Sequence, residues 1–128
     1  MFQRLTHVLI VLGVSGVALT GAVLALPRLR VQGHSMTPTL FPGDHLVVLG
    51  LPPAAGRLLV ITDPRQPGRL MVKRCASREA DGRVWVVGDN PPRSTDSRHF
   101  GPVDPDLFVG RPLYRYQPTG SAGWVLWL

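Results

Sequence analysis

The sequence is short of lysine in an unusual way. It has 14 basic side chains, and Lys73 is the one lysine among them. The others are arginines, whose guanidinium group stays charged in proteins and so cannot accept a proton. A buried lysine can become neutral and then act as a base. The composition therefore indicates Lys73 as a candidate catalytic base. A single lysine retained by chance in an arginine-rich sequence explains this one observation equally well.

Cysteine is also scarce, since Cys75 is the only one. A single cysteine excludes an internal disulfide and any multi-cysteine metal site, and it is most simply an apolar residue of a strand. The spacing of His34, Asp44 and His45 fits no familiar zinc site. We therefore expect neither a metal nor a cofactor.

The basic residues lack the clustering of a nucleic-acid interface. The net charge of +6 comes from arginines that are scattered singly, without a basic run or interleaved aromatic residues. We therefore expect no nucleic-acid partner. The positive charge is consistent instead with an anionic membrane surface nearby.

No stretch after residue 27 keeps a helical apolar period over three turns. The sequence shows short apolar runs separated by Pro and Gly, which indicates a mostly β domain over residues 28–128. The predicted strands are residues 46–49, 58–61, 70–75, 84–87 and 107–109, the last extending toward residue 116. Asp81-Gly82 is expected to form a hairpin turn, and residues 123–128 either a last strand or an aromatic contact with a bilayer.

One long uncharged run precedes this domain. Val8 to Leu26 gives 19 residues without charge, about 28 Å of helix for a hydrocarbon core of about 30 Å. We expect residues 1–27 to be a single transmembrane helix in the lipid bilayer; a cleaved secretory signal is the alternative. Because Arg28 and Arg30 follow the run, the positive-inside rule taken alone favours a cytoplasmic C-terminal domain.

A base needs a group to activate, and Ser35 lies in the most unusual context of the six serines. Gly33 lets the backbone pass close to another group, and Pro38 stiffens the following turn. On the strand that holds Lys73, alternation places Met71 and Cys75 on the same face, so burial among them would disfavour the ammonium. A polar, turn-rich segment over residues 88–103 could surround such a site.

Together these segments resemble the type I signal peptidases, a family of membrane serine proteases with a Ser–Lys dyad. The family motif Ser-Met-x-Pro-Thr-Leu matches residues 35–40, and its apolar strand ending in Lys-Arg matches residues 71–74. The motif Gly-Asp-Asn…Ser-x-Asp-Ser-Arg-x-x-Gly-x-Val matches residues 88–90 and 94–103. The motifs occur in the family's order, so the resemblance implies a compact signal-peptidase-like β domain.

The resemblance also implies roles for individual residues. Ser35 would be the nucleophile and Lys73 the general base of peptide-bond hydrolysis through an acyl-enzyme, with a protein or peptide as substrate. Ser94 would orient the lysine amine. The residues implied in oxyanion stabilisation or in support of the site are Ser35, Gly33, Ser94, Asp89, Asp96 and Arg98, of which Asp96 and Arg98 would form an ion pair. Met36 and Pro38 are expected beside the substrate cleft.

Departures from the family pattern leave the substrate open. Gly33 stands where some members have a serine that completes the oxyanion hole, so the Ser35 N–H would carry most of that work. Residues 90–92 read Asn-Pro-Pro in place of the usual Asn-Arg, which is similar to the maturation proteases of nickel-type superoxide dismutase. The family implies a bacterial cell membrane with the catalytic domain on the outer face, whereas the dismutase precursor is made in the cytoplasm.

Two further functions compete with a leader peptidase. A self-cleaving regulator of the Ser–Lys repressor type lacks support because the sequence shows no helical DNA-binding domain. A catalytically inactive, membrane-bound peptide-binding module is opposed by the presence of both Ser35 and Lys73.

Overall fold

The structure is a computed structural model that describes residues 26–128, and it is built mainly of antiparallel strands. Each apolar run predicted to be a strand forms one, and β1 and β7 complete the set. The strands are β1 (Arg28–Arg30), β2 (His45–Leu49), β3 (Leu58–Thr62), β4 (Leu70–Arg78), β5 (Val84–Val87), β6 (Phe108–Gln117) and β7 (Gly123–Trp124). The prediction of a mostly β domain is therefore confirmed.

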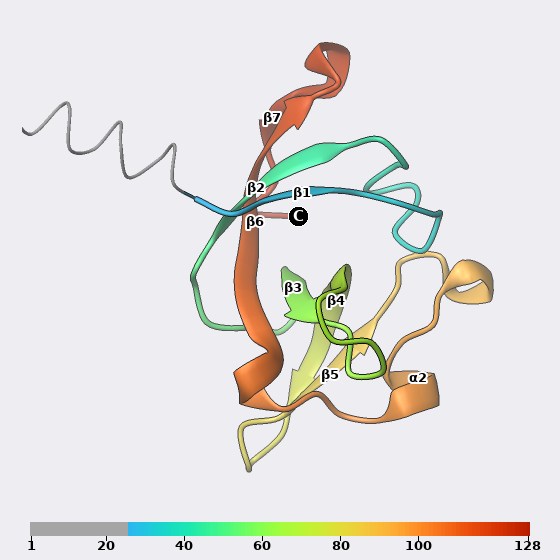
Figure 1. Cartoon of the computed structure of the whole chain (residues 1–128), viewed down its shortest axis with the longest axis vertical. Helices are drawn as coiled ribbons and strands as arrows, with labels where there is room; N and C mark the ends of the chain where they lie inside the picture. The colour runs from blue at the N-terminus through green and yellow to red at the C-terminus, as the bar shows by residue number, and fades with distance from the viewer. Residues whose placement is uncertain (1–25) are drawn as a thin grey trace, which may run out of the picture.

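Strand β6 joins two sheets into one continuous path. The strand order is β1-β2-β6-β3-β4-β5, with β7 also paired to β6, and Figure 1 shows β6 running from the upper sheet into the lower one. Gly110 lies where β6 changes partner. It has a φ of 155°, and a Cβ there would stand 2.3 Å from the carbonyl oxygen of Leu49. Only glycine permits this close crossing of strands.

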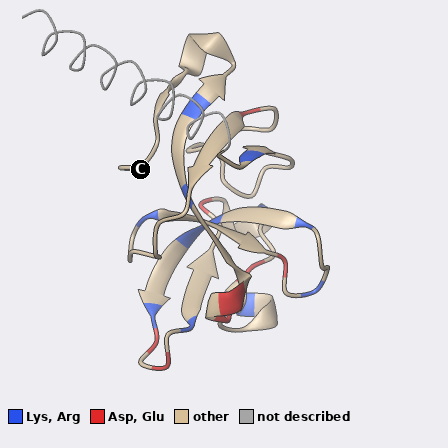
Figure 2. Cartoon of the chain, turned by 60° about the vertical axis from the view of Figure 1, so that its left-hand side comes forward, with Lys and Arg blue, Asp and Glu red and all other residues tan. Residues whose placement is uncertain are grey.

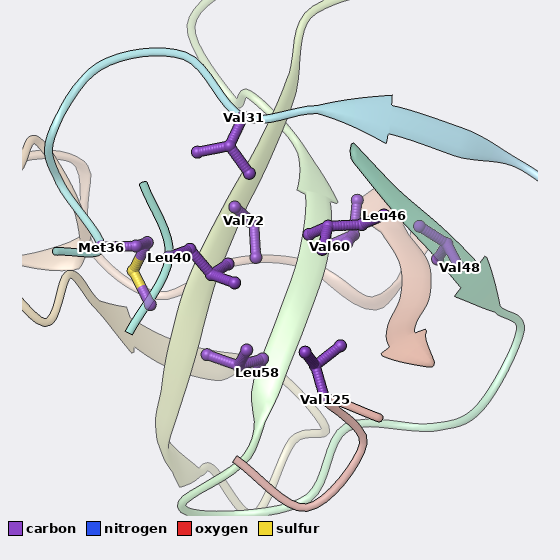
Figure 3. Packing of buried hydrophobic residues seen from close by; sticks show 9 residues of the cluster. All are labelled: Val31, Met36, Leu40, Leu46, Val48, Leu58, Val60, Val72 and Val125. Atoms are coloured by element: carbon purple, nitrogen blue, oxygen red, sulfur yellow. The ribbon is translucent and has the colours of Figure 1, made fainter. Parts of the chain in front are cut away.

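Two apolar clusters occupy the two sides of the β3–β4 pair. The first contains Val31, Met36, Leu40, Leu46, Val48, Leu58, Val60, Val72 and Val125 (Figure 3). The second contains Leu59, Ile61, Met71, Cys75, Val84, Val86 and Val103. Alternation along β4 sends Val72 into the first cluster and Met71 and Cys75 into the second, as the period of a strand requires. Each fully buried aliphatic side chain contributes about 1.5–3 kcal/mol to folding.

The connections are tight turns and very short helices. Asp81-Gly82 forms the predicted hairpin turn, closed by a hydrogen bond from Glu79 N–H to Arg83 O. The polar segment after β5 folds into a 3-10 turn at Pro91–Arg93 and a short helix, α2 (Ser97–Phe100), whose N-cap is Asp96. Two further 3-10 turns, at Pro105–Leu107 and Thr119–Ser121, flank β6. The sequence analysis anticipated turns here but not α2.

The predicted membrane anchor at residues 1–27 falls almost entirely outside the described residues. Within residues 26–128, no helix combines the length and apolar character that a bilayer crossing requires. The division of the chain at residue 27 stays a prediction.

Candidate active site

Ser35 lies in the turn that connects β1 to β2, and its side chain is half-buried. Asn90 fixes this turn from the other side of the site. Its backbone N–H donates to Ser35 O at 2.9 Å, and its side-chain amide donates to His34 O and to Thr37 Oγ1, both at 2.9 Å. Gly33, with a φ of 71°, provides the left-handed bend that leads into the turn.

Lys73 lies in the middle of β4 and is only 3% exposed. It pairs with Leu59 of β3, and its neighbours on the same face of the strand, Met71 and Cys75, belong to the second apolar cluster. Burial lowers the pKa of Lys73 from its ordinary value to about 8. The negative charge of Asp96 opposes this shift without cancelling it.

Ser94 connects the lysine to a buried carboxylate. The amine of Lys73 donates to Ser94 Oγ at 3.3 Å, and Ser94 Oγ donates to Asp96 Oδ2 at 2.6 Å. Gly88 closes the same corner, because its N–H also donates to Asp96 Oδ2, at 2.9 Å. A Cβ on Gly88 would stand 2.2 Å from Ser94 Oγ and 2.7 Å from Ser35 O, so a side chain has no space here.

Asp96 is fully buried and forms an ion pair with Arg98. Arg98 Nε donates to Asp96 Oδ1 at 2.9 Å, and the second guanidinium contact reaches Oδ2 at 3.0 Å. Burial by itself would raise the pKa of this carboxyl. The hydrogen bonds from Arg98, Ser94 and the Gly88 N–H outweigh burial and hold the pKa of Asp96 well below its usual range. The carboxylate therefore stays ionised and fixes Ser94 rather than taking a proton.

Asp89 lies on the opposite side of β4 from Lys73. It receives two hydrogen bonds from Arg74, at 2.8 Å and 2.6 Å, and one from Thr39 Oγ1. The hydrogen bond with Asp89 raises the pKa of the Arg74 guanidinium. Through Thr39, Asp89 holds the end of the turn that carries Ser35.

A cavity of about 300 Å³ joins the two candidate catalytic residues, since both Ser35 and Lys73 line it. Its remaining lining comes from β1, from the residues just after β1, and from the beginning of β4, and consists of residues 28–32 and 69–72. Neither Met36 nor Pro38 belongs to this lining. Met36 is 1% exposed and packs into the first apolar cluster, where Figure 3 shows it beside Leu40.

The comparisons with known proteins show which family the chain belongs to. The family model described as "Signal peptidase, peptidase S26" matches residues 4–81 and 77–117. The chain belongs to this family. Membership of the type I signal peptidase family, inferred above from three motifs, is thereby confirmed.

Proteins similar to this chain include subunits of mitochondrial inner membrane proteases. The mitochondrial ATP-independent inner membrane protease subunit 1a of Arabidopsis thaliana is 35% identical over 121 residues, covering 73% of this chain and 72% of the relative. The mitochondrial inner membrane protease subunit 1 of Xenopus tropicalis is 32% identical over 116 residues, covering 72% and 70%. Subunit 2 of Mus musculus is 31% identical over 117 residues, covering 68% and 67%.

Several residues of this signal peptidase family member shape the site without having been singled out from the sequence. Gly88 and Asn90 stand in the same Gly-Asp-Asn motif as Asp89, so the motif itself was the available signal. Thr39 and Arg74 likewise belong to matched motifs. What the motifs did not reveal is that Asp89 works with these two residues on one side of β4, whereas Gly88 and Asn90 contact the residues around Ser35.

Proposed function

We propose that this chain is a membrane-anchored serine endopeptidase that removes N-terminal signal or leader peptides with a Ser35–Lys73 dyad. The observation that carries the proposal is the shared cavity. It brings a half-buried serine to a buried lysine whose pKa is lowered to about 8. Family membership supports peptidase chemistry at this cavity. Residues 28–128 would form the catalytic domain, and residues 1–27 the anchor in the bilayer.

The reaction would begin with proton transfer from Ser35 to the neutral amine of Lys73. As the proton leaves, Ser35 Oγ forms a bond to the carbonyl carbon of the substrate, and the carbonyl oxygen takes the negative charge. Collapse of this intermediate breaks the peptide C–N bond, and Lys73 returns its proton to the leaving amine. A water molecule, deprotonated by Lys73, then hydrolyses the Ser35 ester.

The lowered pKa makes this role feasible near neutral pH. A lysine at its ordinary pKa is neutral in about one molecule in a thousand at pH 7.4. With a pKa of about 8, about one fifth of the molecules carry the neutral amine at that pH. Ser94, held by Asp96, would keep this amine pointed into the cavity.

The Ser35 backbone N–H is the group best placed to stabilise the negatively charged intermediate. Within the described residues it donates no hydrogen bond, whereas the Ser35 carbonyl is held by Asn90. An N–H that is fixed in place and has no partner is the requirement of an oxyanion hole. Gly33 would contribute the bend that presents this N–H, with no side-chain donor of its own.

Two substrate classes fit the proposed activity. A general signal peptidase would act on secretory preproteins, and the membrane location of the named relatives favours an anchored enzyme of this kind. The Asn-Pro-Pro sequence at residues 90–92, which begins the 3-10 turn Pro91–Arg93, favours instead a dedicated maturation protease for a nickel-type superoxide dismutase precursor. An inactive peptide-binding module would not need a serine and a lysine of lowered pKa at the same cavity, so this alternative has less support.

The test uses the purified full-length chain in detergent, incubated with a secretory preprotein and with a nickel superoxide dismutase precursor. We expect the wild type to cleave one of them after a small residue and Ser35→Ala to cleave neither. Ser77→Ala, which changes an exposed serine at the far end of β4, is the matched control and should keep full activity. Cleavage that persists in Ser35→Ala would overturn the nucleophile assignment.

A further inference from the structure

The cavity that contains Ser35 and Lys73 is strongly basic. Arg28, Arg30 and Arg69 line it together with Lys73, and no Asp or Glu is among its lining residues. The eight acidic residues of the chain all lie outside the strands, whereas arginines occupy β1, β4 and β6. In Figure 2 the red segments lie in the connections, whereas blue segments lie both on strands and in connections. A peptide entering this cavity therefore meets positively charged side chains and no carboxylate among the residues that line it.

Two strand edges border the cavity and are open to an extended peptide. Among the described strands, β1 pairs only with β2, which leaves its other edge unpaired. The first half of β4, Leu70 to Lys73, pairs with β3 on one side, whereas β5 pairs with β4 only from Arg74 onward. A peptide strand between these edges runs past the arginines on its way to Ser35.

Of the three arginines that line the cavity, Arg30 and Arg69 are the two that, in the described part of the chain, neither lie over an aromatic ring nor donate a hydrogen bond to a carboxylate. Within residues 26–128, Arg30 has no carboxylate within ion-pair distance. Arg69 lies 3.9 Å from Asp63, but that buried carboxylate already accepts three hydrogen bonds from Arg65. The side chain of Arg69 is 58% exposed. Arg28 differs from both, because its guanidinium lies over the ring of Tyr116, 5.6 Å from the centroid.

We propose that Arg30 and Arg69 select substrates that carry an acidic side chain close to the cleaved bond. The inference rests on the proposed peptidase function and assigns that activity a substrate class. Arg30 precedes Ser35 by five residues and Arg69 precedes Lys73 by four. At about 3.3 Å per residue in an extended chain, the recognised side chain lies within about five residues of the bond.

Arginine is well suited to recognise an acidic side chain of the substrate. A guanidinium presents paired N–H donors that match the two oxygens of a carboxylate, so an Asp or Glu side chain gains hydrogen bonds as well as charge attraction. A neutral Gln of the same size gains neither the attraction nor the steering toward the basic cavity. Because Arg69 is largely exposed, the preference is moderate and weakens as salt is added.

The experiment compares two internally quenched peptides built on a signal-peptide cleavage site with small residues before the cut. One peptide carries Glu within five residues of the cut, and the other carries Gln at the same place. We expect the full-length protein in detergent to cleave the Glu peptide with a kcat/KM about fivefold higher at low salt. The double variant Arg30→Gln/Arg69→Gln should lose this preference, so that its kcat/KM values for the Glu and Gln peptides become equal. Arg78→Gln, at the distal end of β4 and outside the cavity, should retain the preference.

A binding measurement separates this inference from the proposed function. The Ser35→Ala protein is titrated with fluorescently labelled versions of the two peptides, and tighter binding of the Glu peptide is expected even without cleavage. Equal cleavage of both peptides by the wild type would leave the peptidase standing and overturn the selection by charge. The selection would also be overturned if the double variant kept the Glu preference and lost only its binding to anionic phospholipid vesicles, since the arginines would then serve the membrane.

Discussion

The two sides of strand β4 shift the pKa values of two neighbouring basic residues in opposite directions. Lys73 faces the second apolar cluster, and burial lowers its pKa to about 8. Arg74, the next residue, points to the other side, where the hydrogen bonds that it donates to Asp89 raise its pKa. The difference arises from burial on the Lys73 side and from direct contact with a carboxylate on the Arg74 side. Asp89 contacts Arg74 directly at 2.6 Å, whereas Asp96 reaches the lysine only through Ser94.

This contrast shows how one strand can carry both a scaffold and a base. The Arg74 side forms a bidentate ion pair that ties β4 to the turn carrying Ser35, through Thr39. On the Lys73 side the neighbouring carboxylate, Asp96, is already ion-paired with Arg98. The lysine therefore remains close to a negative charge without an ion pair of its own, which allows its proton to leave near neutral pH.

The largest effect on activity is expected from a substitution that places a permanently charged arginine on both sides of β4. Lys73→Arg places a permanent cation where a base is required, so kcat/KM for a cleaved precursor should fall about a thousandfold, as in Lys73→Ala. Arg78→Lys, a change of the same kind at an exposed position, is the control and should keep wild-type activity. Substantial activity in Lys73→Arg would show that another group serves as the base.

The stability of the same position should depend on pH. The unfolded chain binds the Lys73 proton up to its ordinary pKa of 10.5, and the folded chain only up to about 8. The folded state therefore gains stability as the pH rises from 8 to 10.5, and the cost of the buried ammonium is fully present below pH 8. Lys73→Met removes this cost, so it should be more stable than the wild type by about 3 kcal/mol at pH 7.

Thermal unfolding of full-length wild type and Lys73→Met in detergent, at pH 7 and at pH 10.5, measures this difference. The advantage of the variant should be large at the lower pH and nearly absent at the higher one. A constant difference at both values would mean that methionine packing, and not the charge, sets the stability.

The smallest effect is expected on the Arg74 side. Asp89→Asn keeps a hydrogen-bond acceptor for Thr39 but removes the negative charge that pairs with Arg74, so it should cost about 1–2 kcal/mol of stability at pH 7. Because hydrogen bonds hold the pKa of Asp89 below its usual 3.8, despite its burial, the difference should shrink as the pH falls below that value.

Melting temperatures and kcat/KM of Asp89→Asn, measured on the same preparation, test whether the two sides of β4 are independent. Activity within about threefold of the wild type is expected, because the Lys73 surroundings are untouched. A loss as large as that of Lys73→Arg, without loss of folded protein, would show that the scaffold side takes part in the chemistry.

Part of the fold was accessible from the sequence because strand patterns are local. The alternation around Lys73 correctly placed Met71 and Cys75 on its face and Val72 on the other, since side chains on a strand alternate regardless of the surroundings. Strand β1 and helix α2 were missed. Each is only three or four residues long and is formed by pairing or capping, with the N-cap supplied by Asp96.

The candidate site divides in the same way. Motif resemblance brought together Ser35, Lys73, Ser94, Asp96 and Arg98, and it implied two contacts among them, Ser94 with the lysine amine and Asp96 with Arg98. The structure connects Lys73 to Asp96 through Ser94 and assigns Asp89 to a different partner. It also places Met36 in the apolar core and puts Arg30 and Arg69 at the cavity instead.

The sequence by itself determined the chemistry available to this protein. It contains one residue that can be a neutral amine, one serine in a turn built around Gly33 and Pro38, and strands with a fixed alternation of faces. Only the tertiary structure decided the proton affinity of that amine, because the pKa of Lys73 depends on burial among residues far apart in the chain and on a carboxylate already bound to Arg98. The sequence specifies which ionisable side chains are present, whereas packing sets the dielectric surroundings and the neighbouring charges that govern how they ionise.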